Sequence, residues 1–128
     1  MQTYMVVMLG GAIGSGLRFW LASLIGAKYG ESFPTGTLVV NVAGCLVIGL
    51  FVALTGTQGT LGASLLTRQF VTVGILGGFT TFSSFGLQTF DLAAKGEWFR
   101  AGLYAFLSFA LCLGAVWAGH GLGKLPAG

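Results

Sequence analysis

Charged side chains are the scarcest class in this 128-residue sequence, in which Asp, Glu, Lys and Arg together make up only 7%. Soluble domains carry about 25% of these residues, so the chain lacks the polar surface that a globular protein needs. Hydrophobic residues make up 55% of the chain, and the mean hydropathy is +0.89. We therefore expect an all-α membrane protein, because helices satisfy their own backbone hydrogen bonds in lipid.

Several functional signals are missing as well. The six basic residues are scattered singly, so the net charge of +3 predicts no nucleic-acid partner. The one histidine, His120, has no carboxylate or nucleophile near it in the sequence, and no enzyme is predicted. Cys45 and Cys112 fall in apolar segments, where we expect small hydrophobic side chains without a redox or metal role. No basic segment precedes the first apolar run, so a cleaved signal peptide is not expected.

The few charges separate four apolar segments. We predict membrane spans at about 4–25, 36–54, 69–90 and 101–122. Each is long enough to cross about 30 Å of hydrocarbon at 1.5 Å per residue. The connections are short, so successive spans should pack as antiparallel hairpins, and residues 1–128 should form a single transmembrane domain.

The basic residues give almost no orientation signal. The first and third connections carry Lys28, Lys95 and Arg100, whereas the opposite side carries Arg68 and Lys124. Because excess Lys and Arg normally mark the cytoplasmic side, this near balance favours insertion in both directions. An antiparallel, dual-topology homodimer is one hypothesis, and a single orientation set by the weak bias or by lipids is the alternative.

No carboxylate lies within the predicted spans, since Glu31, Asp91 and Glu97 fall at or beyond their ends. The spans therefore contain no obvious proton relay or site for a cationic substrate. The polar residues that remain offer hydrogen-bond donors and positive charge, which suit an anion; they are Arg18, Asn41, the hydroxyls of Thr80 to Ser84, Tyr104 and Ser108.

The third span contains a polar cluster directly after a glycine pair. Gly77 and Gly78 near its centre precede Thr80, Thr81 and Ser83. This pattern favours a helix broken near its centre, which frees backbone carbonyls that can hold a small cation, most simply on a two-fold axis between two chains. A continuous helix with a glycine packing contact is the alternative.

Individual residues allow two interpretations. Asn41, one turn after Thr37, either makes an interhelical hydrogen bond that holds a dimer together or is a donor that lines an ion route. Phe82 and Phe85 share one helix face, as a packing stripe or as ring edges turned towards an anion. The i+4 series Tyr104, Ser108 and Cys112 is a possible donor stripe, although its residues alone favour packing.

Three motifs together make the chain resemble the small fluoride channels of the CrcB/Fluc family. They are GGAIGSGLRF at Gly10 to Phe19, GTLVVNVAG at Gly36 to Gly44 and GILGGFTTFSSF at Gly74 to Phe85. The resemblance covers nearly the whole chain. It implies a passive, fluoride-selective channel in a bacterial inner membrane, with two pores per antiparallel homodimer, that exports fluoride and protects the cell from its toxicity.

The resemblance also implies site residues. The fluoride pathway would comprise Asn41, the aromatic pair Phe82 and Phe85, the donors Thr37, Tyr104 and Ser108, and Arg18 as a positive charge near a vestibule. Backbone carbonyls of Gly77 and Thr80 would hold a structural sodium ion at the dimer axis. Cys112 departs from the family, in which a hydroxyl is often found at this position, and a thiol is only a weak donor.

Two other functions are alternatives. A small multidrug transporter is also dimeric and dual in topology, but it needs a glutamate within its first helix, which this chain lacks. A membrane assembly factor without transport activity would explain the glycine-rich packing but not Asn41 and the clustered hydroxyls. Absence of ion flux would favour this last possibility.

Overall fold

The computed structural model describes residues 1–126, and this part of the chain is helical with no strand. The first, second and last long helices are α1 (Gln2–Tyr29), α2 (Thr35–Thr55) and α6 (Trp98–Gly123). Between α2 and α6 lies a composite helical segment, which consists of α3 (Leu65–Gln69), the π-helix η1 (Phe70–Leu76), α4 (Gly77–Phe79) and α5 (Phe82–Ala94). All four long segments are apolar enough to cross a membrane, which confirms the predicted all-α class with four such helices.

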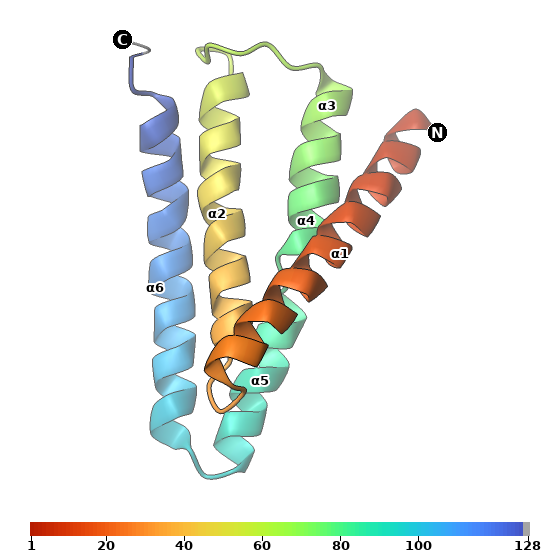
Figure 1. The fold of residues 1–128 in the computed structure, drawn as a ribbon. Coiled ribbons are helices and arrows are strands. Elements are labelled where there is room, and N and C mark those ends of the chain that lie inside the picture. Colours follow the sequence, from red (N-terminus) through yellow and green to blue (C-terminus); the bar gives the residue numbers. More distant parts are fainter. Residues whose placement is uncertain (127–128) are drawn as a thin grey trace.

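The helices do not pack mainly with their neighbours in sequence. Figure 1 shows α2 and α6 running side by side in the same direction, while α1 crosses the segment from α3 to α5 at an angle. The most extensive helix contacts are between α2 and α6 and between α1 and η1. Successive long helices do alternate in direction, as short connections require, but the sequence-based expectation of hairpin packing missed the parallel α2–α6 pair.

Glycines allow both of these close contacts. A Cβ atom on Gly49 of α2 would clash with the Val116 carbonyl oxygen of α6, and one on Gly119 would clash with the Leu46 carbonyl oxygen of α2. Gly14 of α1 lies equally close to the Ile75 carbonyl of η1. In a membrane, where helices associate through van der Waals packing, small residues at such points bring the backbones together.

The composite segment changes conformation after the glycine pair. Gly77 and Gly78 are themselves helical, and α4 ends at Phe79. Thr80 (φ −82°, ψ 159°) and Thr81 (φ −151°, ψ 114°) are extended, and α5 begins at Phe82. The Thr81 hydroxyl accepts a hydrogen bond of 3.2 Å from the Ser84 amide and so caps α5.

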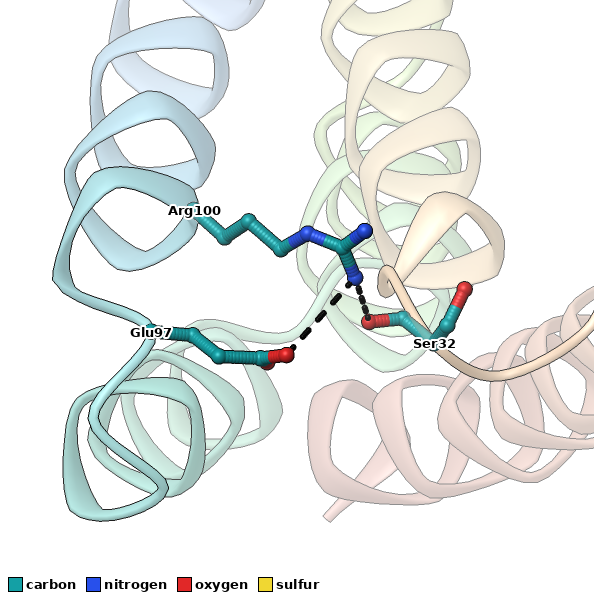
Figure 2. Close-up of polar contacts among 3 residues, drawn as sticks. All are labelled: Ser32, Glu97 and Arg100. Atoms are coloured by element: carbon teal, nitrogen blue, oxygen red, sulfur yellow. Dashed lines mark hydrogen bonds and ion pairs between the residues drawn. The ribbon is translucent and has the colours of Figure 1, made fainter.

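One contact ties the start of α6 to the α1–α2 connection. Arg100 donates to the Ser32 carbonyl at 3.4 Å and lies 3.9 Å from the Glu97 carboxylate (Figure 2). Both ion-pair side chains are more than two-fifths exposed, so the pair itself contributes little stability. The contact therefore mainly positions the connection at this end of the bundle.

Candidate functional site

Asn41 is the residue that organises the site. Its Nδ2 donates to the Thr81 carbonyl at 3.1 Å, and its Oδ1 accepts from the Thr81 amide at 2.8 Å. The side chain thus pairs with the backbone where α5 has not yet begun and helical hydrogen bonds are missing. Asn41 therefore makes its hydrogen bonds within one chain, and one N–H of its amide remains for another acceptor.

Asn41 lines a cavity of about 240 Å³ beside this extended segment. The lining comes from α2, the Thr80–Thr81 segment, α5 and α6, and it is mostly apolar. It includes Asn41, Cys45, Thr80, Thr81, Phe82, Phe85, Ser108, Phe109, Cys112 and Leu113. The fold thus gathers four of the seven predicted pathway residues around one space, namely Asn41, Phe82, Phe85 and Ser108.

The aromatic side chains form a connected group at this cavity. The rings of Phe82 and Phe85 have centroids 5.4 Å apart, and Phe85 meets Phe109 edge to face at 5.8 Å. Phe85 also lies 5.3 Å from the ring of Tyr104. Phe85 is 8% exposed but Phe82 is 73% exposed, so in a single chain only one of the two predicted rings is enclosed.

Polar residues on α2 and α6 face each other in three successive pairs. Thr37 and Tyr104 occupy matching positions on the two helices, and the pairs Asn41 with Ser108 and Cys45 with Cys112 line one cavity. Every pair is separated by 67 residues, and the pairs follow one another at i+4 on both helices. Because α2 and α6 are parallel, one helical register aligns them all. We call these three pairs the polar ladder.

The Ser108 hydroxyl has a special position in the polar ladder. Its Oγ is fully buried and has no hydrogen-bond partner in the described part of the chain. A buried hydroxyl without a partner costs free energy, roughly 1–3 kcal/mol. Ser108 is one of the residues that line the cavity, so its hydroxyl is an unused donor buried next to that space.

Arg18 approaches the same segment from α1. Its guanidinium Nη1 donates to the Thr80 carbonyl at 3.3 Å. Arg18 is not among the residues that line the 240 Å³ cavity, so its link to the site is this hydrogen bond to the Thr80 carbonyl.

The hydrogen bonds of the Gly77 and Thr80 carbonyls, which were predicted to hold a cation, differ from those in a regular helix. In a continuous α-helix the Thr81 amide would donate a hydrogen bond to the Gly77 carbonyl. Here it donates to Asn41 Oδ1 instead, so the Gly77 oxygen lacks its usual helical hydrogen bond. The Thr80 oxygen accepts from Arg18 and keeps a second lone pair. Main-chain oxygens at interrupted membrane helices are ligands that suit Na⁺. Gly77 and Thr80 of one chain give two such oxygens, and Na⁺ would need further ligands.

Sequence reasoning missed several contributors, among them Phe109, which packs edge to face against Phe85 at the cavity. Gln88 of α5 accepts a 2.8 Å hydrogen bond from the Tyr104 hydroxyl, and it lines a second cavity of about 410 Å³ together with Thr37. Cys45 lines the smaller cavity. The i+4 spacing of Cys45 from Asn41 was visible in the sequence, whereas nothing in the sequence linked Gln88 to Tyr104.

Comparison with known proteins gives a consistent result. Residues 5–120 match the family described as CrcB-like protein, Camphor Resistance (CrcB). The chain is 52% identical to the fluoride-specific ion channel FluC of Opitutus terrae, over 94% of this chain and 91% of that protein. It is 53% identical to FluC of Paramagnetospirillum magneticum, over 94% of both chains. It is 51% identical to FluC of Rhodospirillum rubrum, over 93% and 92%.

The match extends over all four long helices, and the relatives align over nearly their whole length. The resemblance inferred from the three sequence motifs is thereby confirmed. With four helices able to span a bilayer, this chain is a multi-pass membrane protein that belongs to the CrcB-like family.

Proposed function

We propose that this chain forms a passive, fluoride-selective channel that exports fluoride from the cell and so protects it from fluoride toxicity. The observation that carries the proposal is that Asn41, Phe82, Phe85 and Ser108 line one cavity. Relatives at about half identity bear the name fluoride-specific ion channel.

The chemistry of the cavity favours a small anion. Fluoride is strongly hydrated, so its partial dehydration must be offset by hydrogen-bond donors along the route. The Ser108 hydroxyl and the free N–H of Asn41 offer such donors. The positive edges of the Phe82 and Phe85 rings can face an anion without the basic group that would trap it.

Selectivity against chloride follows from size and hydrogen bonding. Chloride is larger and accepts weaker hydrogen bonds than fluoride. In a narrow route walled by aromatic rings, it would both fit poorly and recover less of its hydration energy. We assign Thr37, Tyr104 and Arg18 supporting roles. Thr37 continues the donor series along the polar ladder, Tyr104 would join it by turning its O–H from Gln88 towards the ion, and Arg18 supplies positive charge at the Thr80 carbonyl.

We further propose that the working unit is an antiparallel, dual-topology homodimer with two pores. In support, Phe82 is 73% exposed in one chain although it is placed beside Phe85, and the balance of basic residues between the two ends is close to even. A second chain would enclose Phe82. The interrupted segment at Thr80–Thr81 would then be the broken third span of each subunit.

A structural sodium ion on the two-fold axis of this dimer is part of the same proposal. Gly77 and Thr80 of each chain would hold it through their carbonyls, which doubles the two oxygens available in one chain. Such an ion would supply a fixed positive potential beside the anion routes. We place the dimer in the inner membrane of a bacterium.

Anion efflux from liposomes tests the function. Purified protein would be reconstituted with internal fluoride or chloride, and efflux would be started with valinomycin and a potassium gradient. We expect rapid fluoride release that depends on the imposed voltage, with little chloride release. Equal release of both ions would contradict selectivity. No release of either ion from verified, dimeric protein would instead favour the multidrug transporter or the membrane assembly factor.

A further inference from the structure

The thiols of Cys45 and Cys112 form an unassigned pair within the membrane. They are 67 residues apart in the sequence, but α2 and α6 bring both to one cavity, where they are the last pair of the polar ladder. The contacts of Gly49 with Val116 and of Gly119 with Leu46 bring the two backbones close together in this part of the helices. Both cysteines are free and half-buried.

Both cysteines also line the 240 Å³ cavity that contains Asn41 and Ser108. No histidine or carboxylate is among the residues that line it. Within residues 1–126, no group of three or more His, Cys, Asp or Glu side chains is arranged to hold a metal. The cavity therefore offers two sulfur ligands and no third strong ligand, which excludes the tetrahedral sites that zinc prefers.

Two sulfur ligands in an apolar cavity suit a particular class of ion. Soft cations bind thiolates in preference to oxygen ligands. Those with linear, two-coordinate geometry need no third ligand. Burying net charge in a low-dielectric site is costly. A divalent soft cation bound by two thiolates is neutral, so this stoichiometry avoids the cost.

We propose that Cys45 and Cys112 form a binding site for a soft, two-coordinate metal cation, with Hg²⁺ as its best probe, and that metal bound there closes the anion route. On binding, both S–H bonds break, two metal–sulfur bonds form and two protons are released. No electron is transferred, and no oxidant or reductant is required.

Closure follows from the position of the pair. Cys45 lies one helical turn after Asn41, and Cys112 one turn after Ser108. A metal bridge between the two sulfurs would cross the wall of the cavity beside the donors that an anion needs. This part of the inference rests on the proposed function, whereas metal binding itself does not.

Binding is tested first, on the purified dimer without any flux measurement. Hg²⁺ would be added at increasing ratios, with intact mass and released protons as readouts. We expect one Hg²⁺ and two released protons per chain. Cys45→Ser and Cys112→Ser should each bind at least about a hundredfold more weakly, because the second sulfur no longer acts at high effective concentration. Equal binding by the single variants, or one released proton per metal, would overturn the shared site.

Flux is tested second, in the same liposomes, with each variant compared with its own efflux before metal is added. We expect stoichiometric Hg²⁺ to abolish fluoride release from the unchanged protein and a dithiol to restore it. The double variant Cys45→Ser with Cys112→Ser should be insensitive. If Hg²⁺ also inhibited fluoride release from the double variant, closure through this pair would be overturned. Normal fluoride release from unchanged protein that carries one bridged Hg²⁺ per chain would overturn it as well. Protein that binds Hg²⁺ as expected but never conducts fluoride would contradict the proposed function and leave the metal site standing.

Discussion

At the scale of single residues, the two hydrogen bonds between Asn41 and Thr81 define the site. They hold the extended backbone next to Phe82, and they use only one of the two amide N–H groups of a residue that lines the cavity. The amide is well suited to this task because it both donates and accepts. A carboxylate of the same shape accepts only, so replacing the amide separates the two properties.

We predict that Asn41→Asp lowers fluoride efflux by at least about tenfold. The new carboxylate cannot donate to the Thr81 carbonyl, and its charge repels an anion in the cavity. Loss of a hydrogen bond to a charged group, here the fluoride ion, costs about 1.5–3 kcal/mol. A difference of 1.4 kcal/mol corresponds to a factor of ten in an equilibrium constant, so a loss of at least about tenfold in efflux is expected. The liposome efflux assay, read with a fluoride-selective electrode, measures the rate, and size-exclusion chromatography checks that the proposed dimer still assembles. Unchanged efflux would show that Asn41 serves packing only.

Phe82 provides a second prediction at this scale. Phe82→Ile keeps an apolar side chain but removes the aromatic edge, so we expect fluoride efflux to fall sharply while the dimer still assembles. Phe90→Ile on the same helix is the matched control, because Phe90 is similarly exposed but does not line the cavity. Similar losses in both variants would assign Phe82 to general packing.

Substitutions at Ser108 should change fluoride efflux without lowering the stability of the protein. Ser108→Ala removes a buried hydroxyl that has no partner in the described residues, so the melting temperature should stay the same or rise. Fluoride efflux should nevertheless fall, and Ser108→Thr, which keeps the hydroxyl, should retain more of it. A lower melting temperature for the Ala variant would mean that the hydroxyl is bonded within the dimer and acts structurally.

At the scale of helices, the parallel contact of α2 with α6 decides which polar residues meet. Its register aligns Thr37 with Tyr104, Asn41 with Ser108 and Cys45 with Cys112. Gly49 lies in this contact, where a side chain would clash with backbone atoms of α6. Helix packing and site geometry therefore depend on the same glycine.

We predict that Gly49→Ala destabilises the protein and also impairs fluoride efflux. Overpacking of this kind costs about 1–3 kcal/mol, although alanine itself favours helix by about 1 kcal/mol. Gly114→Ala on α6 is the matched control, since a Cβ there meets no atom within 4 Å. Thermal unfolding in detergent, followed by circular dichroism, compares the two. Equal melting temperatures would mean that the helices separate without cost.

At the scale of the whole molecule, the distribution of basic residues bears on assembly. The end with the α1–α2 and α5–α6 connections carries Lys28, Lys95 and Arg100, and the other end carries Arg68 and Lys124. Because Lys and Arg near span ends set orientation, a few substitutions should fix either direction. An antiparallel dimer requires both directions in one membrane.

We predict that two variants with opposite charge bias work only together. One carries Lys28→Gln, Thr57→Lys and Gln58→Lys, and the other carries Lys124→Gln and Glu31→Lys. Each should insert in one orientation and give little fluoride flux alone, because like-oriented chains cannot form the antiparallel pair. Co-expression should restore fluoride resistance in a sensitive bacterial strain. Full activity of either variant alone would contradict the dual-topology proposal.

The sequence by itself determined the membrane class and the number of spans. Hydrocarbon excludes charges and unpaired backbone groups, so four apolar segments bounded by charges leave little choice of secondary structure. The three glycine-rich motifs also identified the family, and they contain Asn41, Phe82 and Phe85. These features are local, so they are readable from the order of residues.

Only the tertiary structure decided which distant residues meet. The order of residues gave no reason to pair Asn41 with the Thr81 backbone, Gln88 with Tyr104, or Cys45 with Cys112. These pairings depend on the register of α2 against α6 and on where α5 begins. Both are set by close backbone contacts between segments far apart in the sequence, and the periodicity of a single helix carries no information about such contacts.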